Sequence, residues 1–118
     1  MLLFLEYPKC STCIKAKKYL MSKEINFTDR NIVEDKPSKD ELTEWIKRSG
    51  TDIKKFFNTS GRLYKEMGLK DKLKSLSDEE KIELLSSNGM LVKRPLLITD
   101  ERVVIGFKED QYIEVIEK

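Results

Sequence analysis

Cys10 and Cys13 are the residues of this chain best suited to chemistry, and they are its only cysteines. They follow an apolar, strand-like run that ends at Glu6, and a helix-like segment begins at Cys13. A thiol near a helix N-terminus meets free N–H groups and the positive end of the helix dipole, which favour its thiolate form. The thiolate is the nucleophile of thiol–disulfide exchange. The pattern therefore predicts a redox pair in which Cys10 attacks and Cys13 resolves the mixed disulfide.

The same spacing also fits two buried, unreactive thiols, because cysteine is among the most buried residue types. A paired CxxC at a helix start argues against that interpretation. Histidine is absent, which excludes Cys–His and Ser–His catalysis and histidine-ligated metals. Two cysteines supply half of a tetrahedral zinc site, so we expect no metal and no cofactor, although a site shared between two copies stays open.

Residues next to the cysteines are candidates for positioning the thiols or a substrate. Lys9 directly precedes Cys10 and could lower the pKa of its thiol. Ser11 and Thr12 lie between the cysteines and are expected in the binding site. The lysines from Lys15 to Lys18 fit a solvated helix face, and they could also attract an acidic partner.

The bulk composition predicts one domain spanning residues 1–118, long enough to bury a core. Charged residues make up 37% of the chain but balance to +2, which is too small a charge to predict nucleic-acid binding. No apolar run approaches a membrane span, and the apolar start stops at Glu6, as in a first strand. We therefore expect a cytoplasmic monomer. In the cytoplasm, a CxxC is more often reactive than structural.

Hydrophobic periodicity and turn residues divide the chain into alternating elements. Strands are expected over residues 1–6, 25–31, 94–99 and 102–106, and helices over 13–23, 38–50, 59–68, 77–88 and 108–116. The strand-rich ends would form one mixed sheet with flanking helices. The segment from about 38 to 87 would be an inserted helical subdomain, so the fold class is α/β.

Local signals mark several helix ends. Ser38 with Glu41 and Ser77 with Glu80 have the spacing of capping boxes. Gly50 is typical of a helix C-terminus. Either residue of the Thr59-Ser60 pair could cap the helix that ends near residue 68. Three aromatic residues lie among apolar neighbours and are expected in the core: Trp45, Phe56 and Phe57.

Four segments together resemble a known family. They are Tyr7-Pro8-Lys9-Cys10-Ser11-Thr12-Cys13, residues 56–64 (Phe-Phe-Asn-Thr-Ser-Gly-Arg-Leu-Tyr), Lys93-Arg94-Pro95, and Ile105-Gly106-Phe107. A CxxC followed much later by an Arg-Pro that leads into a hairpin resembles the arsenate reductase-like family. That family has a thioredoxin-like fold and includes the glutaredoxin-dependent arsenate reductases and the Spx/MgsR-type transcription regulators.

The resemblance implies roles for further residues. Cys10 would be the attacking thiol, Arg94 would lie near it, and Pro95 would follow a cis peptide bond that faces the CxxC. A guanidinium beside Cys10 favours the thiolate and can hold an oxyanion through two hydrogen bonds. Asn58 could supply a hydrogen bond at the mouth of the site. The reductant would be glutathione or a glutaredoxin- or thioredoxin-type protein.

The chain also departs from the arsenate reductases, which hold the oxyanion with three arginines. Arg94 matches one of them, and Asn58 and Phe107 fall where the other two are expected. At roughly 1.5–3 kcal/mol per charged hydrogen bond, two losses weaken oxyanion binding by several kcal/mol. The resemblance therefore implies reduction of a disulfide or another oxidised substrate, and disfavours arsenate reduction.

The alternative is a redox-sensing regulator that binds the C-terminal domain of the RNA polymerase α subunit. Spx-type regulators carry a CxxC as a switch, and Gly50-Thr51-Asp52 is similar to a Gly-Thr-Asp segment at their polymerase-contacting surface. They tend to have Thr-Arg-Ser where this chain has Thr59-Ser60-Gly61. Direct DNA binding is not expected, because the sequence has no helix-turn-helix and no basic stripe.

Overall fold

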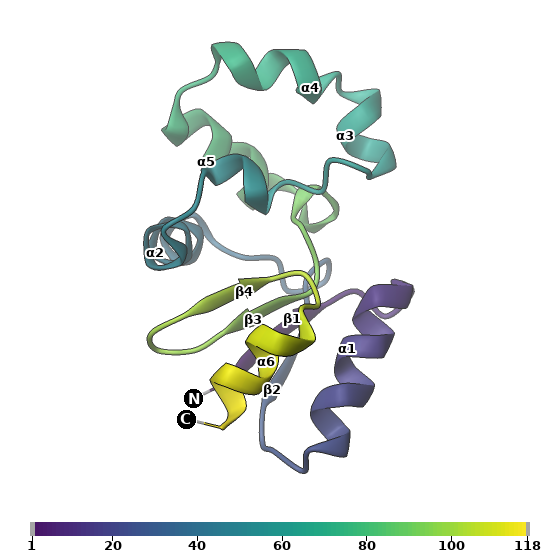
Figure 1. Ribbon diagram of the computed structural model, residues 1–118. Coiled ribbons are helices and arrows are strands. Elements are labelled where there is room, and N and C mark those ends of the chain that lie inside the picture. The colour runs from purple at the N-terminus through teal and green to yellow at the C-terminus, as the bar shows by residue number, and fades with distance from the viewer. Residues whose placement is uncertain (1, 118) are drawn as a thin grey trace.

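One mixed sheet of four strands organises the molecule, and its strand order is β2-β1-β3-β4 (Figure 1). The computed structural model describes residues 2–117. The strands are β1 (Leu3–Glu6), β2 (Thr28–Asn31), β3 (Leu96–Ile98) and β4 (Val103–Ile105). β1 pairs parallel to β2 and antiparallel to β3, and β3 pairs antiparallel to β4. This is the thioredoxin-like mixed sheet that the resemblance implied.

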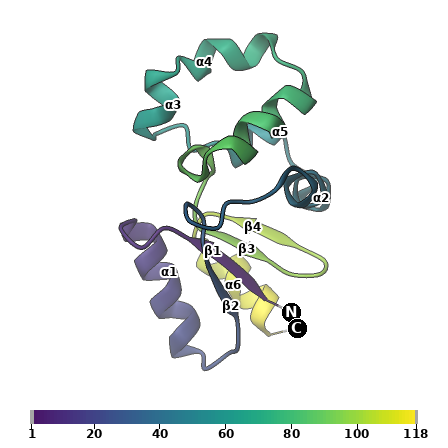
Figure 2. The same ribbon diagram turned by 180° about the vertical axis from the view of Figure 1, so that it is seen from behind.

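Helices cover both faces of the sheet, because successive strand residues point to opposite faces. On one face, Phe4, Leu97 and Val104 pack against α1 (Ser11–Ser22) and α6 (Glu109–Ile116). On the other face, Leu5 and Leu96 pack against α2 (Lys39–Ser49) and the helices that follow it (Figures 1 and 2). The residues predicted for the core, Trp45, Phe56 and Phe57, are buried in this second cluster.

Short helices fill the chain between α2 and β3 and form the part of the molecule farthest from α1 and α6 (Figure 2). They are η1 (Ile53–Phe56), α3 (Arg62–Glu66), α4 (Leu69–Lys72), η2 (Leu73–Ser75), α5 (Asp78–Ser87) and η3 (Gly89–Leu91). The two ends of this segment meet, because Phe57 forms an isolated bridge with Val92 and Lys93 N–H donates to the Phe56 carbonyl at 2.7 Å.

Gly89 fixes the return of this segment toward the sheet. A Cβ at this position would overlap the carbonyl oxygen of Ile32, the residue that follows β2. Backbone atoms of Val33 also lie within the space that the Cβ would need. Only glycine allows η3 and the end of β2 to approach this closely.

Several predicted boundaries are wrong. The first helix begins at Ser11, with Cys10 as its N-cap, and not at Cys13. Neither Thr59 nor Ser60 caps α3, whose N-cap is Gly61 without a side-chain hydrogen bond. The predicted helix over 59–68 is shorter, and Gly68 in the left-handed region separates α3 from α4. The second strand is limited to Thr28–Asn31, and the predicted start of the first strand at residue 1 lies outside the described residues.

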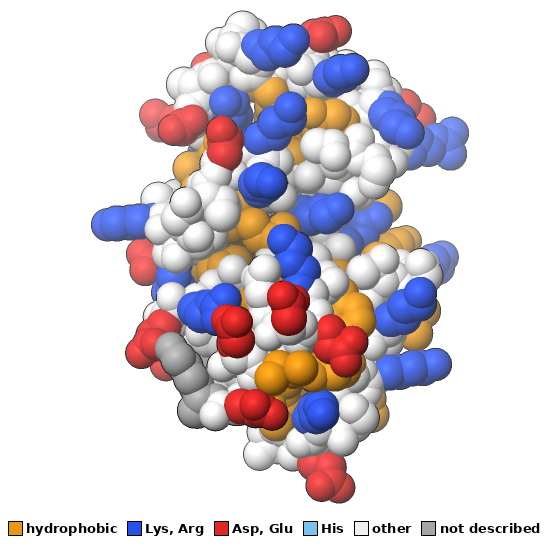
Figure 3. Space-filling model, in the orientation of Figure 1, with side chains coloured by type: hydrophobic (Ala, Val, Ile, Leu, Met, Phe, Trp, Pro, Cys, Tyr) orange, Lys and Arg blue, Asp and Glu red, His pale blue; other side chains and the backbone are white. Residues whose placement is uncertain are grey.

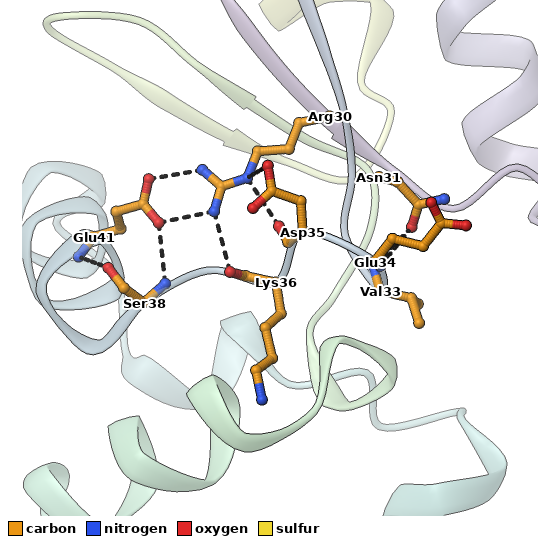
Figure 4. Close-up of polar contacts among 8 residues, drawn as sticks. All are labelled: Arg30, Asn31, Val33, Glu34, Asp35, Lys36, Ser38 and Glu41. Carbon is orange, nitrogen blue, oxygen red and sulfur yellow. Dashed lines mark hydrogen bonds and ion pairs between the residues drawn. The ribbon is translucent and has the colours of Figure 1, made fainter.

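An ion-pair network holds the start of α2 against β2 (Figure 4). Arg30 forms two hydrogen bonds with the Glu41 carboxylate, at 2.7 and 2.8 Å, and its guanidinium lies 5.9 Å from the centre of the Trp45 ring. The predicted capping box is present, because Ser38 and Glu41 each accept the other's backbone N–H. These contacts, first the hydrogen bond from Arg30, lower the pKa of Glu41 to about 2.

Glu41→Gln is therefore expected to destabilise the fold by about 1–2 kcal/mol at pH 7, after allowance for the partial exposure of this carboxylate. The folded pKa is depressed, so the contribution is present above the ordinary value of 4.5 and disappears as pH falls toward 2. Urea unfolding from pH 7 to pH 2.5 measures this. Glu34→Gln, at an exposed neighbouring residue, is the control. If the difference in free energy of unfolding between Glu41→Gln and the native chain is as large at pH 2.5 as at pH 7, the lowered pKa of Glu41 is contradicted.

Candidate functional site

The loop between β1 and α1 places Cys10 at the start of the helix. The Cys10 N–H donates to the Tyr7 carbonyl at 2.9 Å, which closes a turn directly after β1. The Cys10 backbone is extended, and its sulfur accepts the Cys13 N–H at 3.3 Å. Cys10 thus performs the capping role that Ser, Thr, Asp or Asn usually fills. Its half-buried sulfur is aimed at the free N–H groups of the first helical turn.

Cys13 lies in the first turn of α1 and is fully buried. Its sulfur accepts the Tyr7 N–H at 3.5 Å. Burial, together with the hydrogen bond and charge of Cys10, raises the pKa of the Cys13 thiol to about 12, against the lowering effects of the Tyr7 N–H and of Arg94. Cys13 is therefore a protonated thiol at neutral pH while Cys10 is reduced.

The environment of Cys10 acts in the opposite direction. Burial alone would raise the pKa of the Cys10 thiol. Hydrogen bonds from the thiol and N–H of Cys13, the positive charge of Arg94 and a hydrogen bond from the Thr12 N–H outweigh that effect. The pKa of Cys10 consequently lies below its ordinary value, which makes it the more reactive sulfur of the pair.

Arg94 reaches the cysteines because of the strand register. β3 runs antiparallel to β1 with Leu96 opposite Leu5, so the residue two positions before Leu96 lies opposite Tyr7. The Arg94 guanidinium lies 5.2 Å from the centre of the Tyr7 ring, and its Nη1 donates to the Met90 carbonyl at 3.3 Å. Its Nε is buried and has no hydrogen-bond partner within residues 2–117.

The peptide bond between Arg94 and Pro95 is cis, as the resemblance implied. Pro95 is buried, and its carbonyl accepts the Gly106 N–H at 2.8 Å. This bond joins the segment before β3 to the residue after β4. The backbone that carries Arg94 is thereby tied to the end of the β3–β4 hairpin.

Three of the other predicted binding residues lie at the exposed rim. Lys9, Ser11 and Thr12 are all exposed around Cys10, and Thr12 also contacts its sulfur through the backbone. Asn58 lies elsewhere in the chain, is buried, and donates its N–H to the Leu91 carbonyl at 2.8 Å. The Asn58 side chain accepts a hydrogen bond from Ser60 at 3.4 Å, so its observed hydrogen bonds are within its own loop and with η3.

Two residues that contact the site or its helix were not predicted from the sequence. Tyr7 contacts both halves of the site, through its N–H to the Cys13 sulfur and its ring beneath Arg94. Glu6 is 4% exposed and lies on the α1 side of β1, where Lys17 of α1 approaches it to 3.3 Å. The parallel pairing of β1 with β2 brings Asp29 to the same Lys17 at 2.6 Å. No local signal in the sequence identifies a buried glutamate at the end of an apolar strand.

Glu6 and Asp29 both contact the ammonium group of Lys17. Burial, followed by the hydrogen bond and charge of Asp29, raises the pKa of Glu6 to about 7, against the lowering effect of Lys17. Burial would also raise the pKa of Asp29, but its hydrogen bonds with Glu6 and Lys17 lower it. Just below neutral pH, Glu6 is therefore the carboxyl that carries a proton, while Asp29 remains ionised.

Glu6→Gln is expected to remove a pH-dependent loss of stability. The folded pKa lies above the ordinary value of 4.5, so the contribution of Glu6 is complete below that pH and is lost as pH rises through about 7. The variant should match the native chain at pH 4 and exceed it by roughly 1–3 kcal/mol at pH 8. Urea unfolding under reducing conditions measures this, with Glu34→Gln as the control. Equal changes in stability between pH 4 and pH 8 in all three proteins would refute the raised pKa of Glu6.

No helix within residues 2–117 is both long and apolar enough to cross a membrane. The same described residues contain no cluster of three or more potential metal ligands among Cys, Asp and Glu.

The sequence is similar to those of several known proteins. The chain matches the ArsC family over residues 5–115. YusI, an uncharacterized protein of Bacillus subtilis (strain 168), is 55% identical over 115 residues, covering 96% of each chain. The global transcriptional regulator Spx of Streptococcus pyogenes serotype M1 is 30% identical over 104 residues, covering 88% of this chain and 76% of Spx.

The fold comparison gives the same family. The crystal structure of an ArsC family related protein from Bacteroides fragilis matches with a TM-score of 0.94 and 52% identity, covering 97% of this chain and 96% of that one. The family match includes both cysteines, the cis Arg94-Pro95 bond, the end of β1 and all of β2, β3 and β4. The chain belongs to the ArsC family.

Proposed function

We propose that this chain is a thiol–disulfide redox protein that uses Cys10 as nucleophile and Cys13 as resolving thiol. The asymmetry of the two sulfurs carries the proposal. Cys10 is accessible and has a lowered pKa, whereas Cys13 is fully buried and has a pKa of about 12. An attacking thiol must be ionised and reachable, and a resolving thiol must be held back until the first bond has formed.

The exchange balances in two steps. The Cys10 thiolate attacks one sulfur of a partner disulfide, forms a mixed disulfide and releases the other partner sulfur as a thiolate. Cys13 then loses its proton to solvent or base and attacks the Cys10 sulfur, which releases the second partner thiolate. Two electrons have moved from the cysteine pair to the partner, and Cys10 and Cys13 are joined by a disulfide.

The first step itself prepares the second. The Cys10 sulfur raises the pKa of Cys13 through a hydrogen bond and through its charge. Once Cys10 is in a mixed disulfide it has neither proton nor charge, so both effects disappear and the pKa of Cys13 falls. Arg94, whose positive charge lowers the pKa of Cys13 as well, continues to act at this stage.

A thiol donor would return the oxidised pair to the reduced state. Glutathione, or a glutaredoxin- or thioredoxin-type protein, supplies the two electrons by the reverse exchange. We place this cycle in the cytoplasm, where such donors keep thiols reduced.

The surroundings of the site favour a disulfide over arsenate. Among the described residues, Arg94 is the one arginine at this site that could hold an oxyanion. The hydrogen bonds of Asn58 are made within its own loop and with η3. Phe107 packs in the apolar layer between α1 and α6, 5.7 Å from the Tyr19 ring and 5.1 Å from the Tyr112 ring. Neither Asn58 nor Phe107 supplies a cation for an oxyanion.

A stoichiometric reaction tests the proposal. The reduced protein is mixed with one equivalent of bis(2-hydroxyethyl) disulfide and analysed by intact mass and peptide mapping. We expect the loss of two hydrogens, a Cys10–Cys13 disulfide and two equivalents of released mercaptoethanol. A stable mixed disulfide on the native chain, or no reaction, would overturn it.

A second candidate is a redox-gated regulator that binds the C-terminal domain of the RNA polymerase α subunit. The similarity to Spx favours it, together with the exposed Gly50-Thr51-Asp52 turn between α2 and η1. Ser60, where Spx-type regulators carry arginine, weighs against it. An NMR titration of labelled protein with that domain, in the oxidised and reduced states, separates the two. Shifts around Gly50 to Asp52 that are stronger in one redox state support the regulator, and no shifts in either state remove it.

A further inference from the structure

A basic groove lies beside β4, away from the cysteines in the sequence. It encloses about 830 Å³ and runs from the end of α2 and η1, along β4, to the start of α6. Six cationic side chains line it: Arg48, Lys54, Lys55, Lys93, Arg102 and Lys108. Figure 3 shows lysine and arginine side chains gathered around the waist between the helical part above and the sheet below, with apolar surface between them.

The charge of this groove is largely uncompensated. Arg48 pairs with Glu44 at 3.3 Å and donates to the Thr99 carbonyl, and Arg102 pairs with Glu114 at 2.8 Å. The four lysines make no ion pair with any of the residues 2–117. Asp52 also lines the groove, but its carboxylate accepts the Lys54 N–H at 2.9 Å as the cap of η1. Four unpaired cations around one capped carboxylate attract an anionic partner.

The groove also exposes a strand edge. β4 ends the sheet, and within the described part of the chain it pairs with β3 alone (Figure 1). Val103 and Ile105 of β4 and Phe57 line the same groove, so apolar side chains alternate along a backbone with unused hydrogen-bonding groups. An extended peptide can add to such an edge as a further strand, with its alternate side chains in the groove.

We propose that this groove binds an acidic peptide segment in extended form, as a fifth strand beside β4. The backbone edge favours a peptide over a nucleic acid, which could use the charges but could not complete the strand ladder. The lysines disfavour a second copy of this chain, because like charges at a strand edge oppose self-pairing. This binding does not depend on the proposed thiol chemistry.

A titration of the reduced, isotope-labelled protein tests the proposal. The probe is the synthetic peptide Asp-Val-Glu-Val-Asp-Val-Glu, blocked at both ends and added up to millimolar concentration at low salt. We expect amide shifts at Val103–Ile105 and at Lys93 and Lys108. Lys54→Gln/Lys55→Gln should weaken binding roughly three- to tenfold, while Lys70→Gln/Lys74→Gln, at exposed lysines outside the groove, should not.

Two further probes separate the alternatives. A peptide of equal charge with proline in place of the central valine cannot complete the ladder and should lose the shifts of β4. Equal binding of this peptide would mean charge attraction without strand addition and would overturn the proposal. So would an absence of shifts at millimolar peptide, an equal effect of the two double variants, or β4 shifts caused by a thymidine oligonucleotide but not by the peptide. None of these readouts involves Cys10 or Cys13, so the proposed redox function stands or fails separately.

Discussion

Cys10→Ser is expected to abolish disulfide reduction, and Cys13→Ser is expected to stop the reaction at a mixed disulfide on Cys10. In the proposed exchange, the accessible Cys10 thiolate makes the first attack, and the buried Cys13 acts only after that bond exists. Intact mass after addition of bis(2-hydroxyethyl) disulfide measures both results: the unmodified mass for Cys10→Ser and a stable adduct for Cys13→Ser.

Alkylation provides an independent measurement of the same asymmetry. With its pKa at about 12, Cys13 is almost entirely protonated at pH 7, whereas the pKa of Cys10 is lowered. Cys10 should therefore react with iodoacetamide much faster than Cys13. Comparable rates in the native chain, or an adduct on Cys13 in the Cys10→Ser variant, would reverse the assignment of the two sulfurs.

Arg94→Ala is expected to raise the pKa of Cys10 and to slow the first exchange step in proportion to the lost thiolate at neutral pH. The guanidinium charge lowers the pKa of Cys10 in the native chain, and its position over the Tyr7 ring holds it there. Ultraviolet absorbance of the thiolate as a function of pH, in a Cys13→Ser background, measures the pKa of Cys10 directly.

Arg94→Lys separates charge from shape. Lysine retains a positive charge but not the planar guanidinium, so the pKa of Cys10 should lie between those of the native chain and the alanine variant. Arg62→Ala removes an exposed arginine of α3 that pairs with Glu66, and serves as the control for net charge. A titration of Cys10 that is unchanged in Arg94→Ala would remove Arg94 from the mechanism.

Elements with strong local signals could be predicted from the sequence. The capping boxes at Ser38 and Ser77 are present, with the expected partners three residues on. Gly50 ends α2 in the left-handed region, as a helix-ending glycine does. β3 and β4 form a hairpin within the two strand ranges predicted over residues 94–99 and 102–106, because two β-rich runs lie on either side of a short turn.

Helix boundaries that depend on unusual caps could not be predicted from the sequence. The start of α1 was placed at Cys13 because apolar periodicity begins there, but the cap is the sulfur of Cys10, an acceptor that cap preferences do not include. The N-cap of α3 is Gly61, which makes no side-chain hydrogen bond. The prediction of Thr59 or Ser60 as the cap is therefore wrong, although these residue types are the more usual caps. An N-cap whose side chain accepts no hydrogen bond leaves no such signal in the sequence.

The candidate site divides in the same way. The positions of Cys10, Cys13 and Arg94 followed from motif spacing and resemblance. Tyr7 and Glu6 acquire their contacts only when β1 pairs with β2 and β3 and α1 packs on top. Burial of a carboxyl and the neighbours of a ring are tertiary properties, and no local pattern in the sequence encodes them.

The close contact at Gly89 limits how this fold can be engineered. The helices between β2 and β3 resemble a cassette that could be grafted onto another thioredoxin-like sheet. Because Gly89 lies directly against the Ile32 carbonyl and the Val33 backbone, the graft must carry the end of β2 along with the helices. A donor segment that begins at α2 would include Gly89 but not the Ile32 and Val33 backbone against which Gly89 packs.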